Sequence, residues 1–321
     1  MNHTTLVYII FGIVLLVALA LDLGLVNKKG KEISIKTATI QTGFWIALSI
    51  AFWLFVWYEN GSVAATKYIS AYLMEWSLSI DNIFVFILIF ASFKIKKKDI
   101  GFTLLIGILL AIVFRIIFIA VGIGLIERFH WIMYIFGVFL LYTGAKLFFQ
   151  KNAHDKNPGD GKFFQWVKKH LPFTDEEPNS KFVIRKDGKK LYTVLALVVI
   201  VLAGTDIAFA LDSIPTVVSL VKESPTAPFS SSDILIIYSS NIFAILGLRS
   251  LFFLLQGAAN KFKYLQQGIA VILIFIGAKM LIEILHITIP VVISLGVIIL
   301  CIGVSILVSV IYEKKLQQNR H

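Results

Sequence analysis

Long, continuous apolar segments restrict the fold of this chain more than any other feature of its sequence. A membrane-spanning helix needs roughly 20 mostly apolar residues. Nine segments have that character, at about residues 6–26, 39–58, 69–93, 100–126, 130–149, 191–221, 233–257, 265–286 and 289–312. The segments do not alternate between apolar and polar residues, which favours helices over the strands of a membrane barrel. The sequence therefore predicts an all-α polytopic membrane protein with about nine transmembrane helices.

Basic residues gather in alternate connections between these segments. Of the 30 Lys and Arg residues, 23 follow the first, third, fifth, seventh and ninth segments, and 3 lie in the intervening connections. Because basic loops stay on the cytoplasmic side, we expect the amino terminus outside the cell and the carboxyl terminus in the cytoplasm. Membrane topology thus explains the net charge of +11, and we predict no nucleic-acid partner.

Residues 150–190 form the one sizeable polar segment between the predicted helices. About 40 residues are too few for an independent domain with its own core. We therefore predict a cytoplasmic loop. Within it, residues 162–170 (KFFQWVKKH) suit either a short amphipathic helix on the membrane surface or an ordinary solvated connector.

One acidic phrase is written twice inside the apolar segments. The phrases MEWSLSIDNI and TDIAFALDSI place Glu75 in register with Asp206 and Asp81 in register with Asp212. An ionised carboxylate inside a lipid bilayer costs about 2.5–3.5 kcal/mol on insertion scales. Four such groups in register indicate a functional site rather than a packing device.

The repeat extends beyond the acidic phrases. Arg115 follows the first phrase and Arg249 follows the second at a similar distance, and the tripeptide Gly-Ala-Lys recurs at residues 144–146 and 277–279. Each repeat contains three predicted helices, the third to fifth and the sixth to eighth. Because three is an odd number, the second repeat must enter the membrane from the opposite side. Such an inverted repeat is typical of secondary transporters.

The spacing of six residues within each phrase needs an explanation. On an unbroken helix, six residues separate Glu75 from Asp81 by about 240°. Either the helix is locally unwound, or the two side chains face different neighbouring helices. In the second phrase Pro215 follows Asp212 by three residues, and proline removes a backbone hydrogen bond to the preceding turn. This favours a break or kink near Asp212.

The candidate ligands of this site all bind through oxygen. They are Glu75, Asp81, Asn82, Asp206, Asp212, Asp22 and Asn241. Hard oxygen donors suit magnesium, calcium and manganese over zinc or copper. From the ligands alone, calcium and manganese are equally acceptable.

Charge counting narrows the chemistry of the site. The four carboxylates of the repeated phrases carry a total charge of −4 when ionised. Arg115 and Arg249 contribute +2, so that a net charge of −2 remains. One divalent cation or two protons would neutralise that remainder. We therefore expect a cation that is carried in exchange for protons, with no permanently bound cofactor.

The phrases EWSLSIDNIFVF and TDIAFALDSIP, with LDLGL around Asp22 and SSNIFAILGLR around Asn241, resemble those of the TerC family of bacterial membrane proteins. The resemblance covers about residues 18–285. It implies a protein of the bacterial cytoplasmic membrane. The family is associated by name with tellurium resistance and, in several members, with manganese efflux. The resemblance therefore points to manganese as the exported cation, and it carries the acidic residues over as its site.

Two other functions compete with export. The chain would serve as a non-transporting membrane scaffold or a tellurite-resistance factor if the 150–190 loop docked a protein partner. An intramembrane aspartyl protease would need a GxGD motif, and residues 203–206 read AGTD, with Ala203 in place of the first glycine. The sequence also contains no glycine-rich phosphate loop. We therefore expect a transporter and not an enzyme.

Overall fold

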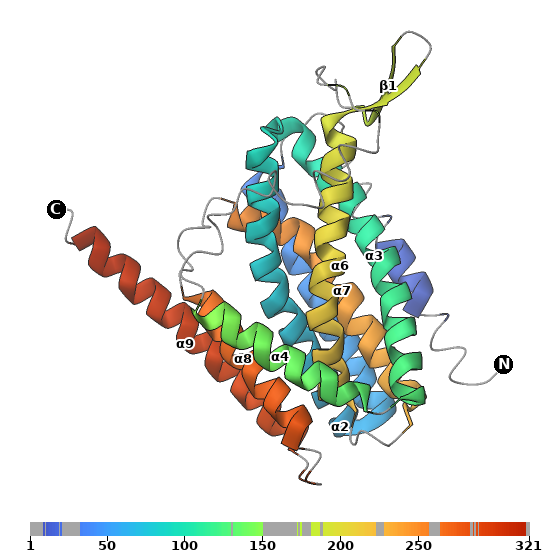
Figure 1. Cartoon of the computed structure of the whole chain (residues 1–321), viewed down its shortest axis with the longest axis vertical. Coiled ribbons are helices and arrows are strands. Elements are labelled where there is room, and N and C mark those ends of the chain that lie inside the picture. The colour runs from blue at the N-terminus through green and yellow to red at the C-terminus, as the bar shows by residue number, and fades with distance from the viewer. Residues whose placement is uncertain are drawn as a thin grey trace.

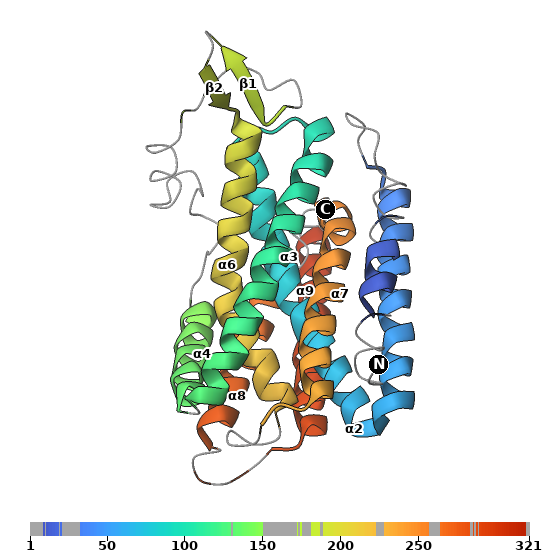
Figure 2. The ribbon, with the colours of Figure 1, turned by 90° about the vertical axis from the view of Figure 1, so that its right-hand side faces the viewer.

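The computed structural model is a bundle of long helices with one small β-hairpin at one end (Figures 1 and 2). The helices are α2 (Ile35–Ser92), α3 (Lys97–Arg128), α4 (Ile132–Phe149), α6 (Val194–Val221), α7 (Ser231–Leu255), α8 (Leu265–Ile282) and α9 (Val291–Gln318), and the strands are β1 (Val183–Lys186) and β2 (Lys189–Tyr192). The structure describes residues 9, 11–18, 20, 33–129, 131–149, 172, 174, 181–186, 189–222, 228–256, 264–282, 285, 287 and 289–318.

Helix α2 is long enough to contain two of the predicted spans. The chain reverses direction at Gly61, whose φ of 82° lies in the left-handed region that glycine tolerates best. Two hydrogen bonds join the arms on either side of this turn: Trp53 Nε1 donates to the Ala65 carbonyl at 3.1 Å, and the Ser49 and Tyr68 hydroxyls lie 2.8 Å apart. Spans 39–58 and 69–93 are therefore antiparallel arms, and no separate loop divides them.

The predicted all-α polytopic membrane fold is confirmed. Within the described residues, α2, α3, α4, α6, α7 and α9 are long and apolar enough to cross a membrane. Helix α8 carries a shorter apolar stretch, Gln266–Ile282. Of the first predicted span, residues 9, 11–18 and 20 are described, and they are helical. The count of nine spans stays a prediction.

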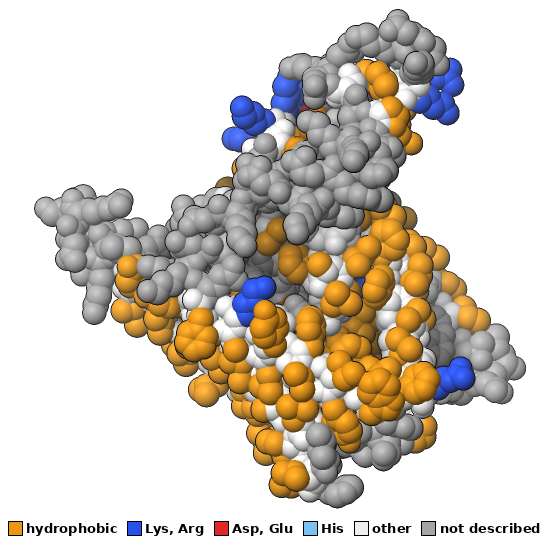
Figure 3. All heavy atoms as spheres, in the orientation of Figure 1, with side chains coloured by type: hydrophobic (Ala, Val, Ile, Leu, Met, Phe, Trp, Pro, Cys, Tyr) orange, Lys and Arg blue, Asp and Glu red, His pale blue; other side chains and the backbone are white. Residues whose placement is uncertain are grey.

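The outer surface of the bundle is largely apolar (Figure 3). Large hydrophobic side chains such as Leu54 on α2, Val113 on α3 and Leu307 on α9 are more than half exposed. A water-soluble monomer seldom exposes so much contiguous apolar surface. Lipid is the solvent that suits this surface, and the protein is a multi-pass integral membrane protein.

The polar segment 150–190 contains structure that the loop prediction missed. Strands β1 and β2 form an antiparallel hairpin in which Val183 pairs with Tyr192 and Lys186 with Lys189. Because β2 runs to Tyr192, helix α6 begins at Val194 rather than at residue 191. The candidate amphipathic helix at 162–170 lies outside the described residues.

The helices of the two predicted repeats pack in a reciprocal way. Helix α2 packs against α7, and α3 packs against α6. In the predicted repeat, the second arm of α2 corresponds to α6, α3 to α7, and α4 to α8. Under this correspondence the α2–α7 contact becomes the α6–α3 contact, and the reverse. The α4–α8 contact maps onto itself, and both helices run obliquely to the upright α3 and α6 in Figure 1. This arrangement agrees with an inverted repeat.

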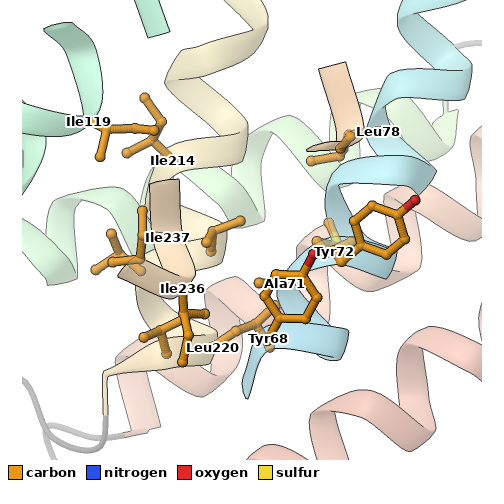
Figure 4. Packing of buried hydrophobic residues seen from close by; sticks show 14 of the residues in the cluster. Tyr68, Ala71, Tyr72, Leu78, Ile119, Ile214, Leu220, Ile236 and Ile237 are labelled. Atoms are coloured by element: carbon orange, nitrogen blue, oxygen red, sulfur yellow. The ribbon is translucent and has the colours of Figure 1, made fainter. Parts of the chain in front are cut away.

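Two apolar clusters fill the interior of the bundle. The first joins Tyr68 and Ala71 of α2 with Ile119 of α3, Ile214 of α6 and Ile237 of α7 (Figure 4). The second lies farther along the same helices, towards the hairpin end. Its residues include Phe86, Leu104, Leu202 and Leu248. Along α3 and α6, a short polar layer separates the two clusters.

Lys67 and Asp233 form a buried ion pair, although the sequence places Lys67 in a connection and Asp233 at the start of the predicted span 233–257. The Lys67 ammonium lies 3.0 Å from Asp233 Oδ1, and the two side chains are 9% and 12% exposed. Lys67 belongs to α2, and Asp233 belongs to a capping box with Ser230 at the start of α7. The pair therefore ties a helix of the first repeat to a helix of the second.

Breaking this ion pair is expected to destabilise the protein. Asp233→Asn keeps the shape of the capping side chain but removes the charge that faces the buried Lys67 ammonium, and we expect a loss of about 3 kcal/mol. The measurement is the unfolding temperature of the purified protein in detergent. Ser230→Ala is the matched control, because it removes a helix cap worth about 1 kcal/mol and leaves the ion pair. Equal losses in both variants would show that only the cap matters.

Candidate functional site

The guanidinium of Arg115 is the centre of the buried polar layer. Its Nη1 donates to Glu75 Oε2 at 2.6 Å, to Asn241 Oδ1 at 2.9 Å and to Ser213 Oγ at 3.1 Å. Its Nη2 donates to Asp206 Oδ1 at 3.1 Å. Charge-assisted bonds to carboxylates are about twice as strong as bonds between neutral groups. Arg115 thus holds four side chains from three other helices in one cluster.

The members of this Arg115 cluster come from four different helices. Glu75 lies on α2, Arg115 on α3, Asp206 and Ser213 on α6, and Asn241 on α7. None of the five residues is more than 5% exposed. The Asn241 amide is further fixed because its Nδ2 donates to the Ile237 carbonyl at 3.0 Å.

The Arg115 cluster joins the two copies of the acidic phrase. Glu75 and Asp206 are in register in the two acidic phrases, and both pair with the same arginine. The structure therefore brings together Glu75, Asp206, Asn241 and Arg115 from the predicted site. Arg249 is buried as well, on α7, but both of these ion pairs come from Arg115.

Three of the predicted acids lie outside what the structure describes. Asp22 is among the undescribed residues, and for Asp81 and Asp212 the helical backbone is described but the side chain is not. Helix α2 is unbroken between Glu75 and Asp81. The break expected near Asp212 is also not observed, because α6 continues through Pro215 to Val221. Local unwinding of the backbone therefore does not account for the spacing of six residues in either phrase.

Comparison with known proteins decides the family. The family model for integral membrane proteins of the TerC family matches residues 60–317 of the chain. The chain belongs to the TerC family. The match begins beside Gly61, where α2 reverses, so the TerC region includes both proposed repeats and α9.

Other TerC relatives align over nearly the whole chain. An uncharacterized membrane protein of Myxococcus xanthus is 40% identical over 92% of this chain and 89% of its own length. The protein Alx of Escherichia coli K12, whose name proposes a membrane-bound redox modulator, is 40% identical over 90% of this chain and 89% of its own length. A membrane protein of Rickettsia felis is 37% identical over 95% and 97%. No solved structure matches the chain.

The described part of this TerC site does not contain a complete metal centre. Among the described side chains, no three His, Cys, Asp or Glu residues lie close enough together to hold a metal ion. Glu75, Asp206 and Arg115 leave one negative charge in the cluster. A metal centre here would need the carboxylates of Asp81 or Asp212 in addition, and the predicted ligand set stays a prediction.

Two carboxylate oxygens of the Arg115 cluster have spare capacity for a ligand. Glu75 Oε1 and Asp206 Oδ2 are buried and accept no hydrogen bond from the described residues. Asp206 also lines a small cavity of about 10 Å³, whose other walls include Leu104, Leu202 and Leu248. A space of about 10–15 Å³ is enough for one water-sized group. Asp206 is the one ionisable residue among the described residues that line this cavity, and Glu75 does not line it.

The sequence missed the central position of Arg115 and the role of Ser213. Arg115 had been assigned only to balance charge, and Ser213 was not among the candidate ligands, whereas Asn82, which was among them, is buried on α2. The available signal was a lone arginine within the apolar helix α3, which has mean hydropathy 3.0 over its most apolar window. A buried arginine in such a helix requires carboxylate partners nearby.

Proposed function

We propose that this TerC protein is a secondary transporter that exports a divalent metal cation, most of all manganese, in exchange for protons. One observation supports it above the others: Glu75 and Asp206, from equivalent positions of two repeats, meet in the buried interior of a membrane protein. Carboxylates at such a position mark ion pathways in membrane proteins. Calcium is the alternative cation, because the same oxygen ligands suit it.

The transport cycle follows from the arrangement of the repeats. The site lies between α2 and α3 of the first repeat and α6 and α7 of the second. If the repeats rock against each other, the site opens to one side of the membrane and then to the other. The cation and protons are the substrates, lipid is the permanent surrounding, and the protein performs no enzymatic reaction.

The remaining predicted ligands complete this proposal. Asp81 and Asp212 supply the further negative charge that a divalent cation needs, and Asn82, Asn241 and Asp22 add neutral or peripheral oxygen ligands. In the orientation given by the basic loops, export runs from the cytoplasm across the bacterial cytoplasmic membrane. The β1–β2 hairpin then lies on the cytoplasmic side.

Transport into proteoliposomes tests the function directly. We expect the purified protein to carry manganese, with calcium, zinc and magnesium assayed in parallel, while the internal pH changes in the direction of proton exchange. Asp81→Asn and Asp212→Asn should each abolish this flux, raise cellular manganese and remove tolerance to it. Normal manganese export by both variants would disprove the assignment.

The alternative is a non-transporting scaffold or stress-resistance factor, including the tellurite resistance that the family name describes. The β1–β2 hairpin, which projects from one end of the bundle, favours a docking role (Figure 2). Removal of residues 150–190 separates the two functions. If the protein is a scaffold, the deletion should abolish its function and the carboxylate variants should keep it. If it is a transporter, the carboxylate variants should lose function and the deletion should keep it.

A further inference from the structure

We propose that Arg115 is a tethered cation that occupies the carboxylates of the site when the transported cation is absent and is displaced when that cation binds. This inference rests on the proposed function and adds to it. It assigns to Arg115 a competition with the cargo, beyond a fixed structural charge. The contacts of the guanidinium, its burial and the small cavity beside Asp206 carry the argument.

The first step concerns the geometry of the guanidinium. Its two terminal nitrogens contact different carboxylates, Nη1 to Glu75 at 2.6 Å and Nη2 to Asp206 at 3.1 Å. The carboxylates come from separate repeats, so the arginine bridges them as a bound cation would. The positive charge of the guanidinium thus stands where the two acidic phrases meet.

The second step concerns the incomplete satisfaction of the cluster. Each carboxylate accepts a hydrogen bond from Arg115 through one of its two oxygens. The other two oxygens, Glu75 Oε1 and Asp206 Oδ2, are buried and accept no hydrogen bond from the described residues. The Nε of Arg115 likewise donates no hydrogen bond to them. A pairing that evolved only to hold helices together would be expected to use these buried groups. Free oxygens are instead what an incoming cation requires.

The third step concerns space. The cavity beside Asp206 has a volume of only about 10 Å³. Apolar clusters close the polar layer towards both ends: Ile108 and Ile119 flank Arg115 along α3, and Leu202 and Ala210 flank Asp206 along α6. A hydrated divalent cation cannot share this space with the guanidinium. Binding at Glu75 and Asp206 therefore requires Arg115 to leave at least one of them.

The consequence is a site that is never left with two bare carboxylates. When the cation departs, the guanidinium returns and neutralises Glu75 and Asp206 in part, which lowers the cost of the empty site during the return step. When the cation arrives, it competes with Arg115 and is bound less tightly than the carboxylates alone would bind it. Weak enough binding is a condition of release on the far side of the membrane.

Substitution of Arg115 in the full-length protein tests the competition. Arg115→Gln removes the charge, and Arg115→Lys keeps it on a single donor group that cannot bridge both carboxylates with separate nitrogens. The measurement is manganese binding to the purified protein in detergent by titration calorimetry. We expect Arg115→Gln to bind at least about tenfold more tightly than wild type, because a positive charge within a few ångströms of the ligand is removed. Arg115→Lys should fall between the two.

Lys279→Gln is the matched control. Lys279 is also a buried cation, on α8, and its ammonium donates to the Ser219 carbonyl at 2.8 Å. Its removal should leave manganese affinity unchanged. An affinity of Arg115→Gln equal to or weaker than that of wild type would overturn the inference; if that variant does not fold, the same comparison with Arg115→Lys decides it. Absence of cation transport by the wild type, in contrast, would overturn the proposed function itself.

Discussion

Arg115→Gln is expected to lose about 3–5 kcal/mol of folding stability when no cation is present, because it leaves two carboxylates buried without the charge that pairs with them. Those carboxylates belong to Glu75 and Asp206, which are 1% and 4% exposed. The measurement is the unfolding temperature and the yield of the protein in detergent.

Removal of the acids should reverse this loss. The triple variant Arg115→Gln, Glu75→Gln, Asp206→Asn replaces all three charges by neutral groups, so that no buried charge is left without a partner. We therefore expect it to recover most of the unfolding temperature and to transport no cation. A triple variant as unstable as Arg115→Gln alone would show that the arginine stabilises the fold by contacts other than these ion pairs.

The fold class followed from the sequence because lipid leaves few alternatives. A backbone in hydrocarbon must satisfy its own hydrogen bonds, so long apolar segments predict helices. The boundaries depended on local chemistry that the apolar pattern does not contain. The turn at Gly61 joins two spans within one helical run. The hairpin was missed although Asp187-Gly188, a strong hairpin dipeptide, lies between the sequences of the two strands.

The site was predictable in its residue types but not in its pairings. The repeat identified Glu75 and Asp206 as equivalent, and the structure brings them together. Which basic residue would contact them depends on how α3 packs between α2 and α6, and no periodicity along one helix contains that information. The same reason explains Lys67 and Asp233, which are 166 residues apart and form a buried hydrogen bond.

The contact between α4 and α8 gives the second large prediction. A Cβ atom on Gly277 would lie 2.7 Å from the Gly137 carbonyl oxygen, and one on Gly144 would lie 2.8 Å from the Ala270 carbonyl oxygen. These are backbone atoms, which cannot move aside as a flexible side chain can. Small residues permit such close approach between membrane helices. The two contacts also support the repeat. When the Gly-Ala-Lys motif of α4 is aligned with that of α8, the contact of Gly144 with Ala270 corresponds to the contact of Gly277 with Gly137.

Gly277→Leu is therefore expected to separate α4 from α8 and abolish accumulation of folded protein. Gly277→Ala should cost about 1–3 kcal/mol, the usual range for overpacking, and Gly144→Ala should cost the same because its surroundings are equivalent. Gly303→Ala, on α9, is the matched control, since a Cβ there meets no atom within 4 Å; replacing a helical glycine should stabilise it by up to about 1 kcal/mol. Unfolding temperatures in detergent measure all of these. Equal tolerance of alanine at residues 277 and 303 would show that the two repeats do not meet at a close glycine contact, and the reciprocal packing would then have to rest on the α2–α7 and α3–α6 contacts alone.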